Sequence, residues 1–154
     1  MKKKLFAVLA LLLVGLAAVT AVSADVISGI GWLEAQGSGT ARVDGYVKNL
    51  HIKGNGVLYY RDGGEEDAAE VTGYGRKIDL PNGWVKYEGF RGTFNLKDAD
   101  QTTVALHGRN IGLQAMGRGT VWLRGHGTYS YGTPDGTVTG DWSPDGQTFS
   151  IDSE

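Results

Sequence analysis

Cysteine is absent from the 154 residues, and proline occurs only three times. Without cysteine the chain cannot form a disulfide scaffold, a Cys-ligated zinc site, a thiol nucleophile or a lipid-modified N-terminal Cys. Three prolines are too few for collagen or for a proline-rich linker. A basic excess is also missing, because 15 Lys and Arg face 17 Asp and Glu for a net charge of -2. We therefore expect no nucleic-acid partner.

Glycine, by contrast, is abundant, with 25 residues in a chain long enough for one domain. The N-terminus resembles a signal peptide: Lys2, Lys3 and Lys4 precede an apolar run, and small residues end it at Ala24. We predict a signal peptide over residues 1–24 and a single glycine-rich domain over 25–154. A retained membrane anchor is the alternative. The protein is then exported and periplasmic, on the cell surface or extracellular.

Alternation of apolar and polar residues dominates the rest of the chain. In the segment 50–61 the even positions are apolar or glycine and the odd positions are mostly polar, and 113–124 repeats the pattern. Successive side chains point to opposite faces of a strand, so one set can face a core and the other water. Paired glycines in the middle of each run indicate a bend or a bulge. The pattern predicts an all-β protein.

The two runs belong to longer similar segments. Aligned without gaps, 29–64 and 92–127 share nine identical residues, of which five are glycines. We interpret this as an internal duplication that gives two similar β-units. The alternative is that glycine-rich strands resemble one another by composition alone.

Turn motifs predict how the strands are joined. All three prolines stand in one kind of tripeptide, Pro-Asn-Gly or Pro-Asp-Gly, at 81–83, 134–136 and 144–146. Proline presets the first turn position and glycine accepts the positive φ that follows. Asp44-Gly45 and Asp62-Gly63 are further hairpin signals. We predict an antiparallel β-sandwich or barrel, with a β-solenoid as the alternative.

Motifs for catalysis or metal binding are few. The three histidines, His51, His107 and His126, lack a metal-binding spacing, and no nucleophile elbow is present. A glycosidase needs paired carboxylates, for which the strand candidates are Glu34, Asp44, Glu70 and Glu88. Calcium could bind the acidic stretch 62–67 or the acidic residues Asp135, Asp141 and Asp145, although neither follows the EF-hand order. We expect no other cofactor, and the chemistry identifies no enzyme.

The outward set of the two runs contains the candidate ligand-binding residues. Tyr59 and Trp122 fall at equivalent positions, and each stands two residues before an arginine, Arg61 or Arg124. Aromatic planes beside guanidinium groups can stack on sugar rings and pair with anionic groups. We predict a ligand-binding face formed by Tyr59, Arg61, Trp122 and Arg124. The alternative is that a second layer or a neighbouring subunit covers the aromatic rings.

Segments such as 29–33 and 117–121, both rich in glycine and β-formers, are similar to those of small uncharacterised secreted glycine-rich β-repeat proteins of prokaryotes. This resemblance implies export and a β-architecture, and no catalytic residues. The sequence predicts a non-catalytic domain that binds an envelope or extracellular polymer, such as a polysaccharide. Two alternatives are a structural envelope protein that self-associates through sheet edges and a small hydrolase with paired carboxylates.

Overall fold

A computed structural model describes residues 30–61, 69–133 and 136–152 of the chain. The predicted signal peptide and the acidic stretch 62–67 lie outside the described residues. The order of elements is β1 (Gly31–Arg61), β2 (Glu70–Thr72), β3 (Arg76–Asp79), the 3-10 turn η1 (Pro81–Gly83), β4 (Trp84–Thr133), β5 (Gly136–Asp141) and β6 (Gln147–Ser150). The described part of the chain holds no helix that is long and apolar enough to cross a membrane.

β1, β2 and β3 form one arm of a long antiparallel hairpin, β4 forms the other arm, and η1 is the tip. Asp79 pairs with Val85, Arg61 with Thr103 and Leu33 with Tyr131. Each of these pairs lies symmetrically about residue 82, whereas the pairs of residues 49–53 and of β2 are shifted by one residue, so the hairpin register continues along both arms with local one-residue shifts. At the tip Asn82 has a φ of 62° and Gly83 a φ of 75°. The turn predicted at 81–83 is confirmed.

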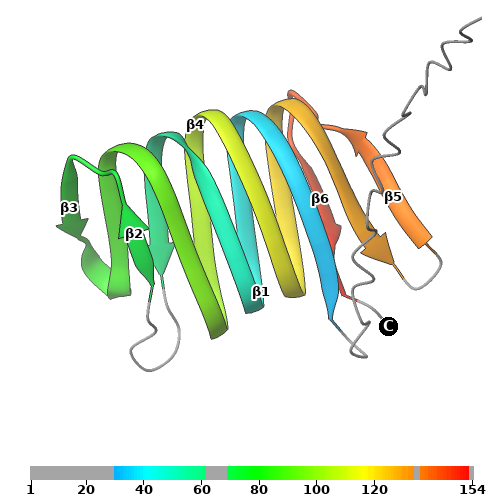
Figure 1. Cartoon of the computed structure of the whole chain (residues 1–154), viewed down its shortest axis with the longest axis horizontal. Coiled ribbons are helices and arrows are strands. Elements are labelled where there is room, and N and C mark those ends of the chain that lie inside the picture. The colour runs from blue at the N-terminus through cyan, green and yellow to red at the C-terminus, as the bar shows by residue number, and fades with distance from the viewer. Residues whose placement is uncertain (1–29, 62–68, 134–135, 153–154) are drawn as a thin grey trace, which may run out of the picture.

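The hairpin is wound into a coil, so that β1 lies between successive turns of β4 (Figure 1). Leu33 pairs with Ala115 as well as with Tyr131, and Leu50 pairs with both Leu96 and Ala115. One turn of β4 therefore takes 16 residues around Leu33, from Ala115 to Tyr131, and 19 residues around Leu50, from Leu96 to Ala115. Every strand segment in the middle of the coil is hydrogen-bonded on both of its edges.

Glycines mark the places where the coil bends. In β1 they recur at Gly37, Gly45 and Gly54, which is every eight or nine residues, or half a turn. Gly45 faces Gly119 of β4, and a Cβ at Gly45 would lie 2.9 Å from the Cα of Gly119. A side chain there would meet the opposite backbone, so glycine permits the two chains to approach and to bend. The hairpin predicted at Asp44-Gly45 is wrong, because this pair lies inside β1 at such a bend.

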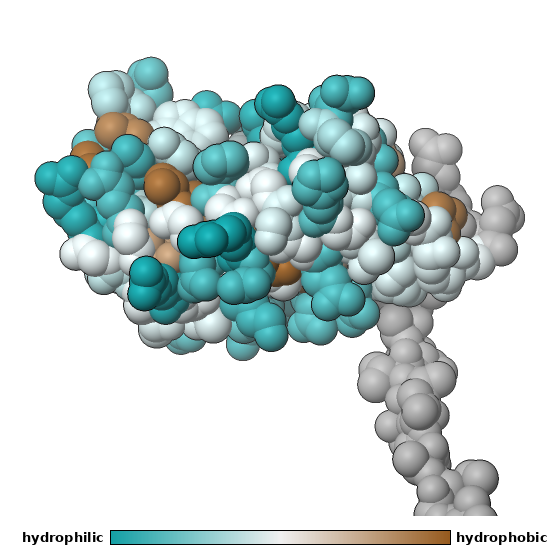
Figure 2. Space-filling view, turned by 90° about the horizontal axis from the view of Figure 1, so that it is seen from above, coloured by the Kyte–Doolittle hydropathy of each residue, from teal (hydrophilic) through white to brown (hydrophobic). Residues whose placement is uncertain are grey.

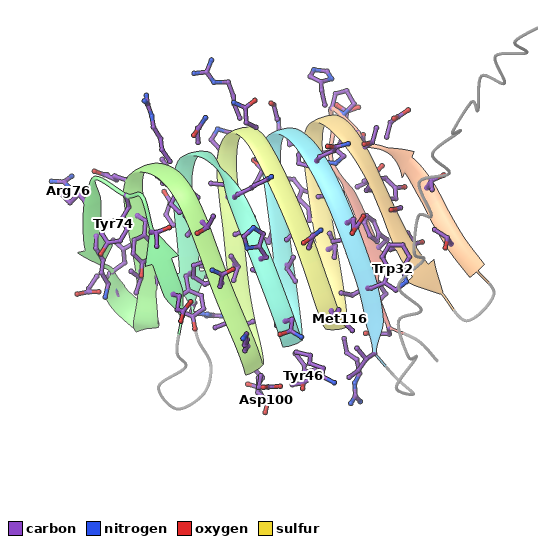
Figure 3. All side chains as sticks on the ribbon, viewed as in Figure 1. Trp32, Tyr46, Tyr74, Arg76, Asp100 and Met116 are labelled. Carbon is purple, nitrogen blue, oxygen red and sulfur yellow. The ribbon has the colours of Figure 1, made fainter. Side chains whose placement is uncertain are left out.

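The bends divide the coil into two layers that face each other. We call layer A the half formed by segments 32–36, 49–53, 93–97, 112–116 and 128–132 with β2 and β5. Layer B is the half formed by segments 40–44, 57–61, 84–88, 103–107 and 120–124 with β3 and β6. Figure 3 shows Tyr46, Asp100 and Met116 along the lower bends of the coil.

The core fills the space between the two layers. The ring of Tyr60 from layer B lies 5.1 Å from that of Phe94 in layer A, and Phe149 of β6 stacks 4.9 Å from Tyr129. The predicted inward set is confirmed, since the large side chains at its even positions in β1 are buried, namely Leu50, Ile52, Leu58 and Tyr60. Burial of these side chains supplies the main stabilising term.

The antiparallel all-β class is therefore confirmed, and the sheet is not closed into a barrel. Its two layers face each other as in a sandwich, while the chain passes from one layer to the other through continuous bent strands. Neighbouring turns alternate between β1 and β4, which makes the contacts antiparallel, unlike a solenoid whose rungs follow one another along the chain. The internal duplication stays a prediction. The glycine spacing also follows from the hairpin register, because glycines of β1 pair with glycines of β4 at the bends.

Candidate functional site

The four residues predicted to bind a ligand lie on the outer surface of layer B, which we call face B. Tyr59 and Arg61 belong to β1, and Trp122 and Arg124 belong to β4. The two segments lie in the same layer, so the coil brings together two pairs that are more than sixty residues apart in the sequence. The residues are nonetheless spread over this face and do not form one compact pocket.

Tyr59 and Trp122 stand in a single row that crosses the strands of face B. Tyr59 pairs with Ala105, Ala105 with Arg42, and Arg42 with Trp122. Three strand spacings of about 4.8 Å separate the two aromatic residues by roughly 14 Å. The small side chain of Ala105 and the guanidinium of Arg42 lie between them.

The two arginines flank this row on opposite sides. β1 and β4 run antiparallel, so two residues beyond Tyr59 and two residues beyond Trp122 lead in opposite directions. The guanidinium of Arg61 lies over the ring of Trp84 at 5.0 Å, and Arg124 Nε donates to the carbonyl of Pro144 at 3.4 Å. Neither arginine has a carboxylate partner among the described residues.

Both aromatic side chains are half-buried on the outer surface and do not enter the core. The indole of Trp122 packs on the turn at Gly146, where a Cβ would lie 2.8 Å from its Nε1. The ammonium of Lys86 lies 5.9 Å from the centre of the Tyr59 ring. Within the described chain, layer A does not cover these rings. The alternative that a second layer covers them is therefore wrong for the described residues.

Face B carries an excess of positive charge. The outward side chains of its strands include five cations, Arg42, Arg61, Arg76, Lys86 and Arg124, and two carboxylates, Asp44 and Glu88. Two more carboxylates adjoin the face: Asp145, in the turn that packs on Trp122, and Asp152, which accepts from Ser150 Oγ at 3.0 Å. Five of the twelve basic residues that the structure describes have outward side chains on this face. Such a face attracts anionic ligands.

Two ion-pair groups hold the carboxylates of Asp44 and Glu88 on face B. Arg42 donates to Asp44 at 2.7 and 2.8 Å, and these hydrogen bonds raise the pKa of the Arg42 guanidinium. Glu88 accepts from Lys86 at 2.7 Å and from Arg76 at 2.6 Å. These bonds lower the pKa of the Glu88 carboxyl, first through Lys86, and the bond to Glu88 raises the pKa of Lys86.

The four carboxylates considered for glycoside hydrolysis are not brought together. Asp44 and Glu88 are ion-paired on face B, whereas Glu34 and Glu70 lie on the outer surface of layer A. Four strand spacings of about 4.8 Å separate Glu34 from Glu70 by roughly 19 Å. Paired carboxylates act at roughly 5–10 Å. Glu34 and Glu70 are therefore too far apart for the carboxylate pair of a glycosidase.

The histidines and the acidic residues form no metal site in the described residues, where no group of three or more such side chains converges. His51 Nδ1 is hydrogen-bonded to Asn95 Oδ1 at 2.6 Å, and His107 Nδ1 to Thr40 Oγ1 at 2.7 Å. The acidic stretch 62–67 and Asp135, both considered for calcium, lie outside the described residues.

Sequence reasoning missed the outer surface of layer A, which we call face A. Two adjoining hollows of about 730 and 1090 Å³ open there, and both are lined by Glu34, His51 and Gln114. The alternation of the sequence could indicate that these three side chains point outward, as it did for His51. That the three are neighbours follows only from the coil, because they belong to different turns.

A comparison of the chain with family models, with curated proteins and with solved structures finds no match in any of the three.

Proposed function

We propose that the protein binds an extended anionic polymer, such as an acidic polysaccharide of the cell envelope or its surroundings, across face B. The observation that carries the proposal is the placement of Tyr59 and Trp122 in one row, with Arg61 and Arg124 on its two sides. Aromatic rings provide surfaces on which sugar rings stack, and guanidinium groups pair with carboxylate or phosphate.

The spacing favours a polymer over a small ligand. Two aromatic residues roughly 14 Å apart can contact different units of one chain at the same time. Each contact alone is weak, and their combination along one chain raises the effective affinity. Neither arginine is paired with a carboxylate among the described residues.

The surface chemistry also supports a polar ligand. Figure 2, which views the coil from above, shows a mostly hydrophilic surface on that side, with small separate hydrophobic patches. In the part of the chain that the structure describes, Tyr74 and Val138 are the exposed large hydrophobic residues. Stable protein partners usually bury a broad apolar patch at the centre of their interface.

Affinity electrophoresis with polygalacturonate, and with dextran as an uncharged reference, tests the proposal. We expect polygalacturonate to retard the protein, with retardation that weakens as salt is added. The double variant Tyr59→Ala, Trp122→Ala should bind at least about tenfold more weakly. The matched control Tyr46→Ala removes an aromatic ring at a bend between the layers and should bind like the wild type. Equal retardation of all three proteins would overturn the proposal.

The arginines are tested separately. Arg61→Gln with Arg124→Gln should weaken binding and also reduce its dependence on salt, because two of the charge contacts are removed. Arg109→Gln, which removes a guanidinium from an exposed residue outside face B, is the control. If the two variants show the same salt dependence, the arginines of face B do not contact the polymer.

Self-association through a sheet edge is a second candidate function, which β5 favours. This strand pairs with β4 on one edge, its residues 136–140 are uncharged, and Val138 is 37% exposed. Edge strands without charged or proline residues can pair with a second copy. Light scattering across a wide concentration range tests this function, and Val138→Lys should abolish any dimer. A monomer at every concentration would remove the candidate.

A further inference from the structure

Face A carries a row of polar side chains that crosses seven strand segments in direct register. Each residue of the row pairs with the next across a strand boundary. The row consists of Glu70, Asn95, His51, Gln114, Glu34, Ser130 and Thr139. Six strand spacings of about 4.8 Å give it a length of roughly 29 Å. A regular row of this length matches an extended ligand rather than a single small molecule.

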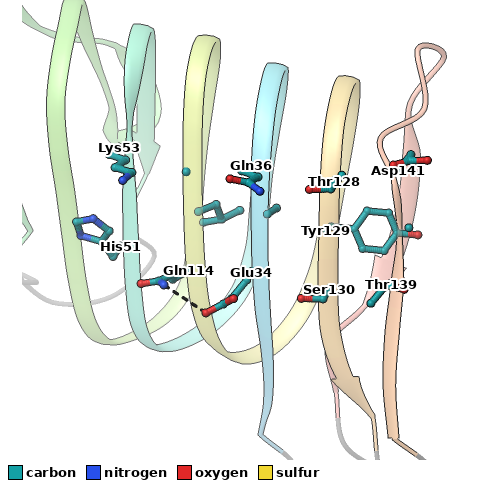
Figure 4. A pocket seen from close by; sticks show the side chains of 14 residues that line it. Glu34, Gln36, His51, Lys53, Gln114, Thr128, Tyr129, Ser130, Thr139 and Asp141 are labelled. Atoms are coloured by element: carbon teal, nitrogen blue, oxygen red, sulfur yellow. Dashed lines mark hydrogen bonds between the residues drawn. The ribbon is translucent and has the colours of Figure 1, made fainter. Parts of the chain in front are cut away.

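The two hollows of face A follow this row. The smaller one extends from Glu34 and His51 toward Thr139 and Asp141, as Figure 4 shows, and the larger one extends toward Glu70 and Lys97. The hollows adjoin, because they share the three central residues of the row, and we call them together the depression of face A. A chain lying in it would contact side chains from β1, β2, β4 and β5.

The side chains of the depression both donate and accept hydrogen bonds. Gln114 Nε2 donates to Glu34 Oε1 at 3.3 Å, and the amide of Asn95 is hydrogen-bonded to His51. A carboxylate that accepts, an amide that does both and a hydroxyl that does both are the groups that recognise the hydroxyls of a sugar. Gln114 and Glu34 are exposed, so their remaining lone pairs and protons face the depression.

Trp32 gives the depression an apolar surface. Trp32 stands in the next row, pairs with Met116, and lines the larger hollow beside Glu34. Gly132 lies beneath the indole, since a Cβ there would overlap its ring. An indole held in this way against the sheet, beside hydrogen-bonding groups, offers a flat surface to the C–H face of a sugar ring.

Charge distinguishes face A from face B. The outward charged side chains of face A are the carboxylates Glu34, Glu70 and Asp141 and the ammonium groups Lys53 and Lys97. Their near balance gives no positive excess that would attract an anionic polymer, whereas the outward side chains of the strands of face B include five cations and two carboxylates. A depression with nearly balanced charge and many hydroxyl and amide groups matches an uncharged polymer that carries many hydroxyl groups.

We infer that face A is a second binding site, separate from face B, and that it takes a neutral polysaccharide. The two faces lie on opposite sides of the same coil. A protein with both sites can connect a neutral polymer to an anionic one. This site does not depend on the proposed function of face B, because no side chain of its row belongs to face B.

Affinity electrophoresis with soluble neutral polysaccharides tests the inference, using hydroxyethyl cellulose, mixed-linkage β-glucan and galactomannan as probes. At least one of them should retard the wild-type protein. The variant Trp32→Ala, Gln114→Ala should bind that probe at least about tenfold more weakly. The face B variant Tyr59→Ala, Trp122→Ala should bind it like the wild type, as should the bend control Tyr46→Ala.

The outcomes separate the two sites. Absence of retardation by all three probes overturns the neutral-polymer site, and so does equal retardation of the wild type and the Trp32→Ala, Gln114→Ala variant. Loss of retardation in the face B variant alone assigns the neutral polymer to face B and likewise overturns the inference. Thermal unfolding of each variant establishes that it is folded. Glu34→Gln provides a second, isosteric test of the row if the double variant is unstable.

Discussion

Gly39 and Gly125 face each other across β1 and β4 with no room for a side chain on either residue. A Cβ on Gly39 would lie 2.9 Å from the Cα of Gly125, and a Cβ on Gly125 would lie 2.9 Å from the Cα of Gly39. The carbonyl of the residue before each glycine would lie closer still. The bend of the coil at this point therefore depends on glycine in both strands.

Replacing Gly39 tests this relationship. Gly39 has a φ of 138° and Gly136 a φ of 140°, but a Cβ on Gly136 would have no atom within 4 Å. Alanine is strained at both positions, and only at Gly39 does it also meet the opposite backbone. We expect Gly39→Ala to lower the free energy of unfolding by at least about 2 kcal/mol more than Gly136→Ala does. Urea unfolding measures the difference, and equal losses would contradict the close approach.

The contact between layers A and B predicts a large effect at Phe94. This side chain is fully buried and packs against Tyr60 of the opposite layer. Phe94→Ala should lower the free energy of unfolding by about 3–5 kcal/mol, because it leaves a cavity between the layers. Tyr74→Ala, at a side chain that is 42% exposed, is the control and should cost much less. Similar losses at both positions would show that the layers do not meet at Phe94.

The ion-pair group of face B predicts the pH dependence of Glu88. Hydrogen bonds from Lys86 and Arg76 hold the pKa of Glu88 below its ordinary value of 4.5. With a lowered folded-state pKa, the stability contributed by Glu88 is complete above that ordinary value. It is lost as the pH falls through the lowered pKa. Lys86→Met should move the Glu88 pKa back toward 4.5, because it removes the larger cause.

Carboxyl NMR shifts followed from neutral to acidic pH measure this change. Lys97→Met, which removes an ammonium group from face A, should leave the Glu88 titration where it is in the wild type. A Glu88 pKa that does not respond to Lys86→Met would mean that the pair seen in the structure is not formed in solution.

The alternation of residues predicted much of the local structure. It assigned the inward side of 50–61 and 113–124 and the outward position of Tyr59 and Trp122, because side-chain direction in a strand depends only on position. It could not show which strands are neighbours, since pairing in this coil joins residues from different turns. The sequence does contain a signal for the register, because Gly37, Gly45 and Gly56 mirror Gly127, Gly119 and Gly108 about Asn82.

The translational match between 29–64 and 92–127 predicted a duplication, which stays a prediction. Glycines repeat every half turn, so a shifted copy of the sequence also places many of them in coincidence. The row on face A was missed for a related reason. Its central residues Glu34, His51 and Gln114 carry no local motif, and their proximity exists only after the hairpin is wound.

Cross-linking of paired cysteines tests the wound hairpin most directly, and both faces depend on this winding. The chain has no cysteine of its own, so introduced pairs react without background. Glu34 pairs with Ser130 in the hairpin register and with Gln114 in the next turn of the coil. We predict that a short thiol cross-linker joins Glu34→Cys to Ser130→Cys and also joins Glu34→Cys to Gln114→Cys. Glu34→Cys with Thr148→Cys, on opposite faces, should stay unlinked. Cross-linking to position 130 without cross-linking to position 114 would show an unwound hairpin and contradict the account.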